Sequence, residues 1–154
     1  MKSPMKKLTA IFLSLCLSFL FAQLASAADK IVRIPIETAM ETSDAKDKLD
    51  TTNIKFYFGK QKYPGIQQKL GTDVANKRTN SVGKSDEVSC SRAFVSAMIS
   101  MQSRAQKLGA NAVVNIESYF KKKTYSSNTD FECAVGSLMS AVTLKGDFVK
   151  VSGK

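Results

Sequence analysis

The clearest pattern of apolar and polar positions lies between residues 85 and 108 of the 154-residue chain. Apolar side chains recur there at spacings of three and four, as on one face of an α-helix; they are Cys90, Phe94, Ala97, Met98, Met101, Ala105 and Leu108. Ser85 can accept from the first free backbone N–H groups, and Gly109 can take the left-handed conformation that ends a helix. The pattern predicts one long helix over residues 85–108, with Cys90 facing the core.

Period-two alternation and aromatic content predict strands before this helix. Residues 30–36 alternate apolar and polar side chains, and Pro35 places this strand near an edge or a strand end. Residues 55–59 form a second, aromatic-rich strand, while the polar residues 37–49 are weakly helical. We assign no element to residues 67–84, which hold many polar side chains and two glycines.

Two further strands are expected after the helix, over residues 111–120 and 131–145. A polar connection joins them, so they should form an antiparallel hairpin with a long loop. Gly146 should break the second strand, leaving a short terminal strand at residues 148–151. The predicted fold class is α+β, with one main helix packed on a small, mostly antiparallel sheet and held by one disulfide.

The amino terminus has the pattern of a secretory signal peptide. Lysines precede an apolar run at residues 10–22, and Ala25-Ser26-Ala27 follows it, so cleavage is expected after Ala27. A permanent membrane anchor is the alternative, but the run is shorter than the roughly 20 residues that span a bilayer. A lipid anchor on Cys16 is not expected, because Leu15 and Leu17 flank it with bulky side chains. We therefore expect a single α+β domain over residues 28–154 in the periplasm or secreted, with no stable membrane span after cleavage.

Two cysteines, Cys90 and Cys133, remain after the expected cleavage. An even pair in an oxidising compartment favours a structural disulfide. A redox couple, which normally has a C-x-x-C pair, and a metal site, which needs more soft ligands, are the alternatives. The chain has no histidine, which excludes Ser-His-Asp and Cys-His catalysis and imidazole metal sites. We expect neither catalytic activity nor a metal or cofactor.

Basic residues dominate the charged positions. The net charge is +10, and it falls to about +7 when the three lysines of residues 1–27 leave with the signal. An excess of this kind suits an anionic surface, although it can also serve only solubility. The candidates for contact with such a surface are Lys121, Lys122, Lys123, Lys77, Arg78 and Lys84.

Residues 78–85 (RTNSVGKS) look like a phosphate-binding loop, because Gly83-Lys84-Ser85 directly precede the predicted helix. Such a loop needs glycine at its first position, where this chain has Arg78. No buried strand is evident before it. We therefore do not expect a nucleotide ligand.

Three segments, KFYFGKQKYPGIQQ, NKRTNSVGKSDEVSC and GANAVVNIESYFKKK, resemble a group of small secreted proteobacterial proteins that often carry the label "excinuclease ATPase subunit". The resemblance covers most of residues 28–154. It implies a small exported protein, and the label implies an association with nucleic acid.

The carboxy-terminal half is more weakly similar to the disulfide-bonded domain of the Rcs envelope-stress sensor lipoprotein. The similarity lies in the helix, Gly109-Ala110-Asn111-Ala112-Val113-Val114, the polar loop, Cys133 and Gly136-Ser137. It implies an α/β scaffold with a disulfide.

We expect a non-catalytic domain of the envelope or periplasm that binds an envelope protein or an anionic surface component. The alternatives are a nucleic-acid-associated protein, as the label suggests, and a hydrolase that uses carboxylates. Nucleic acid is the less favoured partner, because export separates the protein from the chromosome.

Overall fold

The computed structural model describes residues 30–152. The signal peptide expected at residues 1–27 lies outside that range. Within it the chain forms six strands, three α-helices and one 3₁₀ turn. In chain order these are β1 (Lys30–Pro35), α2 (Ile36–Met40), α3 (Ser43–Lys48), β2 (Lys55–Phe58), β3 (Ile66–Asn80), α4 (Asp86–Leu108), β4 (Ala112–Ser118), η1 (Phe120–Lys122), β5 (Asp130–Val135) and β6 (Met139–Val151).

The strand β6 lies at the centre of one six-stranded sheet. One edge of β6 pairs with β3 from end to end, while β5 pairs with the start and β4 with the end of its other edge. The sheet continues from β5 to β1 and from β4 to β2. Only β2 and β4 run parallel. An α+β fold with a main helix on a mostly antiparallel sheet is therefore confirmed.

The long helix α4 begins and ends where the sequence predicts. The Ser85 side chain accepts a hydrogen bond from the backbone N–H of Val88 at 3.2 Å, and Gly109 ends the helix with a φ of +69°. The apolar stripe from Cys90 to Ala105 is buried against the sheet. Phe94 stacks on Phe131 of β5, with 4.3 Å between the ring centroids.

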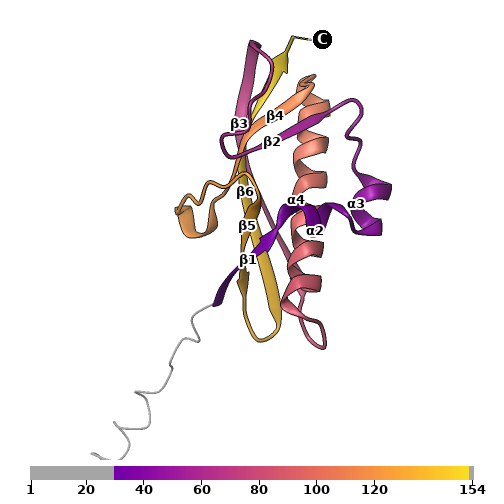
Figure 1. The fold of residues 1–154 in the computed structure, drawn as a ribbon, viewed down its shortest axis with the longest axis vertical. Helices are drawn as coiled ribbons and strands as arrows, with labels where there is room; N and C mark the ends of the chain where they lie inside the picture. The colour runs from indigo at the N-terminus through magenta and orange to yellow at the C-terminus, as the bar shows by residue number, and fades with distance from the viewer. Residues whose placement is uncertain (1–29, 153–154) are drawn as a thin grey trace, which may run out of the picture.

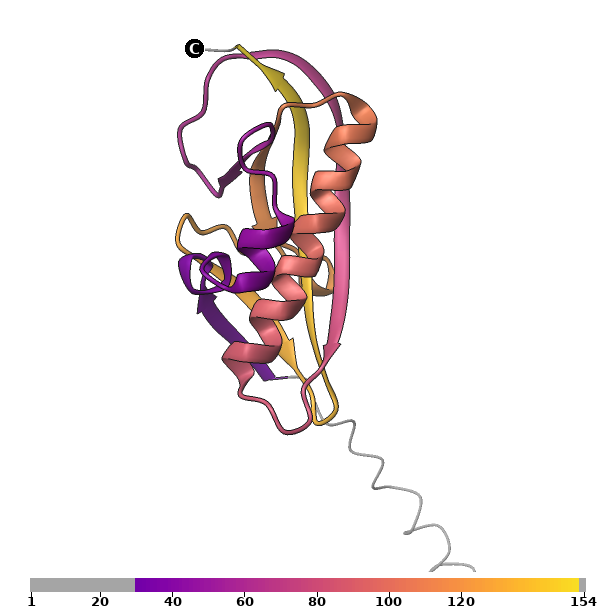
Figure 2. The ribbon, with the colours of Figure 1, turned by 90° about the vertical axis from the view of Figure 1, so that its right-hand side faces the viewer.

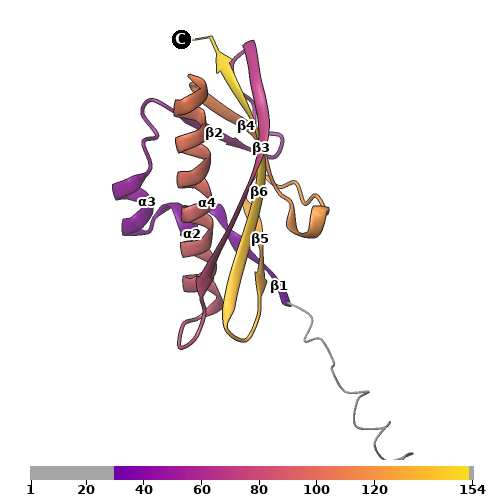
Figure 3. The same cartoon turned by 180° about the vertical axis from the view of Figure 1, so that it is seen from behind.

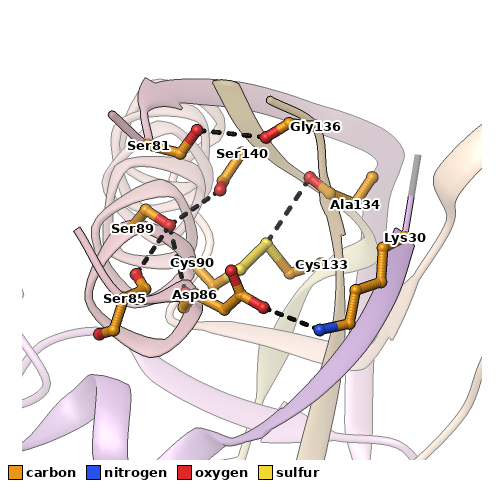
Figure 4. Close-up of polar contacts among 10 residues, drawn as sticks. All are labelled: Lys30, Ser81, Ser85, Asp86, Ser89, Cys90, Cys133, Ala134, Gly136 and Ser140. Carbon is orange, nitrogen blue, oxygen red and sulfur yellow. Dashed lines mark hydrogen bonds and ion pairs between the residues drawn. A yellow bond between two sulfur atoms is a disulfide. The ribbon is translucent and has the colours of Figure 1, made fainter. Parts of the chain in front are cut away.

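A disulfide joins α4 to β5, as Figure 4 shows. Cys90 and Cys133 are both fully buried, and their Cα atoms lie 5.9 Å apart. Beside this bond, the hydroxyl groups of Ser89 on α4 and Ser140 on β6 form a hydrogen bond of 2.8 Å. The predicted pairing is confirmed, and the helix is tied to two strands of the sheet at the same level.

The observed strands differ from the predicted ones in several places. Residues 66–80, left unassigned for the most part, form the 15-residue strand β3. The strand expected over 131–145 is divided by a turn at residues 136–138, so β5 and β6 form the hairpin and β4 pairs with β6 instead. Most side chains of β3 are exposed, so its sequence lacks the alternation of apolar and polar residues that marks a half-buried strand.

Gly146 does not break β6 but lies within it, contrary to the prediction. A Cβ atom on Gly146 would lie only 2.8 Å from Cγ1 of Val113 on the neighbouring strand. The glycine therefore permits close packing beneath α4, where its extended backbone continues the strand.

The two sides of the sheet differ. We call the side that α4 covers the packed face and the opposite side the open face. Val142 and Leu144 of β6 belong to the core of the packed face, whereas Ala141 and Thr143, between them in sequence, lie on the open face. Figures 1 and 3 show the helices on one side of the sheet and the segment after β4 projecting from the other. Within residues 30–152, no helix is long and apolar enough to cross a bilayer.

Candidate functional site: a basic recess on the open face

A recess of about 560 Å³ lies on the open face, between the sheet and the segment of residues 119–129, here called the 119–129 loop. We call this hollow the basic recess. Its walls come from β3, β5, β6 and the loop, and its lining residues are Val74, Asn76, Arg78, Tyr119, Phe120, Lys121, Lys122, Ala134, Met139, Ala141 and Thr143. Its floor is mainly apolar and cations lie around it, so it suits a ligand that carries negative charge next to an apolar part.

The 119–129 loop is fixed to the sheet at its start. The backbone N–H of Tyr119 donates to the carbonyl of Thr143 at 2.8 Å, and Ser118 and Tyr125 exchange two backbone hydrogen bonds of 2.9 and 3.0 Å. The loop therefore leaves β4 and returns beside it.

The end of the loop packs against the chain after β2. Gly59 has a φ of +54°, and a Cβ atom there would lie 2.7 Å from the backbone of Ser127. The side-chain oxygen of Asn128 accepts from the backbone N–H of Lys60 at 2.8 Å. The loop is thus held at both ends, and the wall that it contributes to the basic recess is a built feature of the fold.

The turn of the loop has an unusual backbone. Lys121 and Lys122 both have positive φ values, of 50° and 63°. Side chains with a Cβ atom disfavour this left-handed region by about 1–2 kcal/mol per residue. Two consecutive lysines in this conformation carry a cost that glycine would avoid, and they place their side chains at the recess.

Ion pairing distinguishes two cations of the recess from five basic side chains elsewhere. Neither Arg78 nor Lys122 has an acidic partner within ion-pair distance among residues 30–152. Five other basic side chains do, namely Lys30, Arg33, Lys48, Lys69 and Arg104. The described lining of the recess also contains no Asp or Glu. No acidic side chain of the described lining therefore offsets the charges of Arg78 and Lys122.

Aromatic rings at the loop interact with further cations. The Arg33 guanidinium lies 4.3 Å from the ring centroid of Tyr125, and the Lys145 ammonium lies 5.1 Å from that of Tyr119. Lys121 makes a similar contact with the ring of Phe120 at 5.1 Å. Such contacts are attractive by about 0.5–1 kcal/mol at exposed sites. They orient the aromatic wall of the recess.

A polar network joins β3, β4 and β6 on the same face. The carboxylate of Asp147 accepts hydrogen bonds from Thr72 and, at 3.0 Å, from Asn115, and the ammonium of Lys69 lies 2.9 Å from it. Partial burial raises the pKa of Asp147, but the hydrogen bonds from Thr72, Asn115 and Lys69 outweigh it and hold the pKa below its ordinary value. The network fixes the β-bulge at Asn115, next to the root of the loop.

The structure brings together three of the six basic residues chosen from the sequence. Arg78, Lys121 and Lys122 line the basic recess. Lys77, the neighbour of Arg78, lies on the other side of β3, in a separate hollow between β3 and α4. Lys123 follows η1 and is exposed.

Lys84 lies in the turn between β3 and α4, outside the recess. Its backbone N–H donates to the carbonyl of Ser81, and the hydroxyl of Ser85 caps α4. The segment that looks like a phosphate loop is therefore the end of a strand, a turn and a helix cap.

The sequence pattern does not indicate the aromatic wall or the floor of the recess. Tyr119 and Phe120 were assigned to a strand, which ends at Ser118. Met139 and Ala141 fall in one predicted strand with the residues of β5, but the turn at 136–138 reverses the chain and pairs Ala141 with Ala134. The alternation of residues 139–143 indicates that Met139, Ala141 and Thr143 share one side of a strand. It does not indicate whether a helix covers that side.

No protein-family model matches the chain, and no curated protein sequence matches it.

Proposed function

We propose that the protein is an exported, non-catalytic domain of the envelope or periplasm, and that it binds the anionic group of an envelope protein or surface component in the basic recess. The observation that carries the proposal is the site itself, where Arg78 and two lysines surround an apolar floor. Because the described lining holds no carboxylate, it favours binding of an anion over hydrolysis by paired acids.

Recognition of a carboxylate or phosphate group fits the chemistry of the lining. Arg78 offers a planar guanidinium, which can bind either group through two parallel hydrogen bonds. Lys122 adds a second charge from the loop, and the hydroxyl of Thr143 and the amide of Asn76 provide polar partners at the floor. Met139 and Ala141 would contact the apolar part of the ligand.

Export is supported by the signal-like pattern of residues 1–27 and by the buried disulfide, since such bonds persist in oxidising compartments. The intact mass of the protein recovered from cell fractions tests this part. A chain that begins at Ala28 in the periplasmic or secreted fraction is expected. An uncleaved chain in the cytoplasm would contradict export.

Binding is tested by titrating ¹⁵N-labelled protein and following its amide NMR signals. The probes are inorganic phosphate, a short polyglutamate peptide, phosphatidylglycerol in small bicelles and a DNA oligonucleotide. We expect phosphate, the peptide or the anionic lipid to shift signals of Arg78, Thr143 and the 119–129 loop. These shifts should weaken as salt is added, because exposed charges are screened.

The pattern of shifts distinguishes the outcomes. Shifts spread evenly over the basic surface, with no preference for the recess, would contradict the proposal. Stronger recess binding to DNA than to the other probes at physiological salt would replace it with the nucleic-acid alternative. Weak DNA binding that occurs only at low salt does not support the nucleic-acid alternative, since any basic protein binds DNA in this way.

A further inference from the structure

The strand β3 forms a long edge of the sheet. It pairs with β6 on one side, and within residues 30–152 no strand pairs with its other side. Figure 2 shows it as the long strand at one margin of the sheet. A strand edge of this kind presents unpaired backbone N–H and C=O groups to any other strand that meets it.

The two halves of this edge differ. Residues 66–71 contain two breaks in register with β6, between Ile66 and Gln68 and between Lys69 and Gly71. Bulges twist an edge and protect it from pairing. From Gly71 to Asn80 the register is uninterrupted. The second half is therefore a regular strand edge without bulges; the backbone N–H of Val74 donates to the Asp73 carboxylate at 2.8 Å, a bond that pairing with another strand would replace.

We propose that this half of β3 pairs with β3 of a second copy of the chain, antiparallel and centred on Ala75. Identical subunits usually assemble around a two-fold axis, which brings the same patch of both copies together. An axis perpendicular to the sheet makes two β3 strands antiparallel and keeps the packed faces of both copies on one side. Residues 71–79 of each copy then form the contact.

The charges of β3 select the register. With this axis, two residues that lie opposite each other in the paired strands must project from the same side of the sheet. The two-fold axis therefore passes through a residue position of β3 and not between two neighbouring residues. Centred on Ala75, the pairing sets Asp73, the one acid of β3, opposite Lys77 of the other copy, and it does so twice. Opposite charges at facing positions stabilise a pair of strands. Centred on Val74 or Asn76, it sets Asp73 opposite Ala75 or Thr79 and gains neither pair.

The pairing extends the open face across both copies. Val74, Asn76 and Arg78 belong to the lining of the basic recess and lie at this edge. In the proposed register, Thr72 of the second copy lies beside Arg78, and its Asn76 lies beside Val74. The second copy therefore adds polar groups to the recess, and two recesses lie on one face. Self-association is independent of the ligand, so it stands or fails apart from the proposed function.

Sedimentation equilibrium of the protein recovered from the envelope fraction tests the proposal. We expect a dimer, with Asp73→Lys and Lys77→Asp each weakening it by about tenfold or more, because each makes both facing pairs like-charged. The double variant Asp73→Lys/Lys77→Asp restores opposite charges in the same register and should regain the wild-type affinity.

Arg104 serves as a control, because its guanidinium lies 3.5 Å from Asp73 in the same copy. Arg104→Gln removes this contact and should leave the dimer intact. A wild-type protein that remains a monomer at about 0.1 mM would overturn the proposal. So would a double variant as weak as the single variants while circular dichroism shows it folded, because the charges would then not face each other.

Discussion

The two faces of the sheet differ in what covers them, and we propose that they divide stability and recognition between them. On the packed face, Leu144 is 1% exposed and belongs to the same core cluster as the disulfide and the stacked aromatic rings. On the open face, Met139 and Val74 are each 44% exposed, and the loop that walls the recess has two lysines in a left-handed conformation. The packed face therefore supplies the larger core, whereas the open face carries a smaller buried cluster around Val114 and Val149 beside the strained loop and the exposed recess.

The difference follows from where the helix packs. Alternate side chains of β6 point to opposite faces, so one strand contributes both to the core and to the recess. Because α4 is bound to β5 by Cys90–Cys133, the core of the packed face is held independently of the loop. Changes on the two faces should therefore separate stability from binding.

Removing the disulfide should have the largest effect on stability. The bond closes a loop of 44 residues counting both ends, so the chain-entropy model gives about 4 kcal/mol for Cys90→Ala/Cys133→Ala. Urea unfolding of this variant measures the loss. A decrease below about 1 kcal/mol would show that the packed face does not depend on this link.

Shortening one side chain on each face should give unequal losses. Leu144→Ala leaves a cavity under α4 and should cost about 2–4 kcal/mol, whereas Met139→Ala at the rim should cost less than about 1 kcal/mol. The two free energies of unfolding are compared in urea. Equal losses would contradict the division between the faces.

Relieving the loop backbone should stabilise the protein slightly. Lys122 has a φ of 63°, and glycine adopts that conformation without a Cβ penalty, so Lys122→Gly should gain up to about 1 kcal/mol. The same change should weaken anion binding. Lys123→Gly, at a negative φ of −97°, is the matched control and should gain nothing. A destabilised Lys122→Gly would show that the side chain itself supports the loop.

Acid should weaken the polar network on the open face by the smallest amount. Since its hydrogen bonds hold the pKa of Asp147 below its ordinary value, the carboxylate stabilises the fold above about pH 4, the pKa region of the unfolded chain. This contribution is lost as the pH falls through the folded-state pKa. In Asp147→Asn, the free energy of unfolding, measured with urea, should therefore fall less steeply as the pH is lowered below about 4.

Asp44 provides the comparison for that experiment. Its hydrogen bond and attraction to Lys48 also lower its pKa, but this carboxylate is on the surface. Asp44→Asn should change the pH dependence of the unfolding free energy below about pH 4 less than Asp147→Asn does. The opposite order would show that the open-face network contributes nothing of its own.

The helix and the disulfide were predictable because their signals are local. The spacing of Cys90, Phe94 and Met98, with a cap at Ser85 and glycine at 109, specifies a helix and its buried side without any tertiary information. Because only two cysteines remain after the expected cleavage, they can pair only with each other within one chain. The helix needs only the sequence of one segment, and the disulfide needs only the count of cysteines after the expected cleavage.

The long strand and the recess were not predictable for the same reason. β3 is an exposed edge with mostly polar side chains, so it lacks the apolar alternation by which strands are recognised. The recess combines residues from β3, β5, β6 and the loop, and its composition depends on strand order. Lys77 and Arg78 are neighbours in sequence, yet the pleat of the strand sends them to different faces.

In the proposed function, anion binding depends on the basic recess and not on overall charge. The most direct test compares Arg78→Gln/Lys122→Gln with Lys46→Gln/Lys107→Gln, which removes the same charge from helices α3 and α4. Affinity is measured for whichever anionic probe shifts the recess signals. The account predicts at least about tenfold weaker binding for the recess variant and less than about twofold for the control. Equal losses in both variants would contradict it.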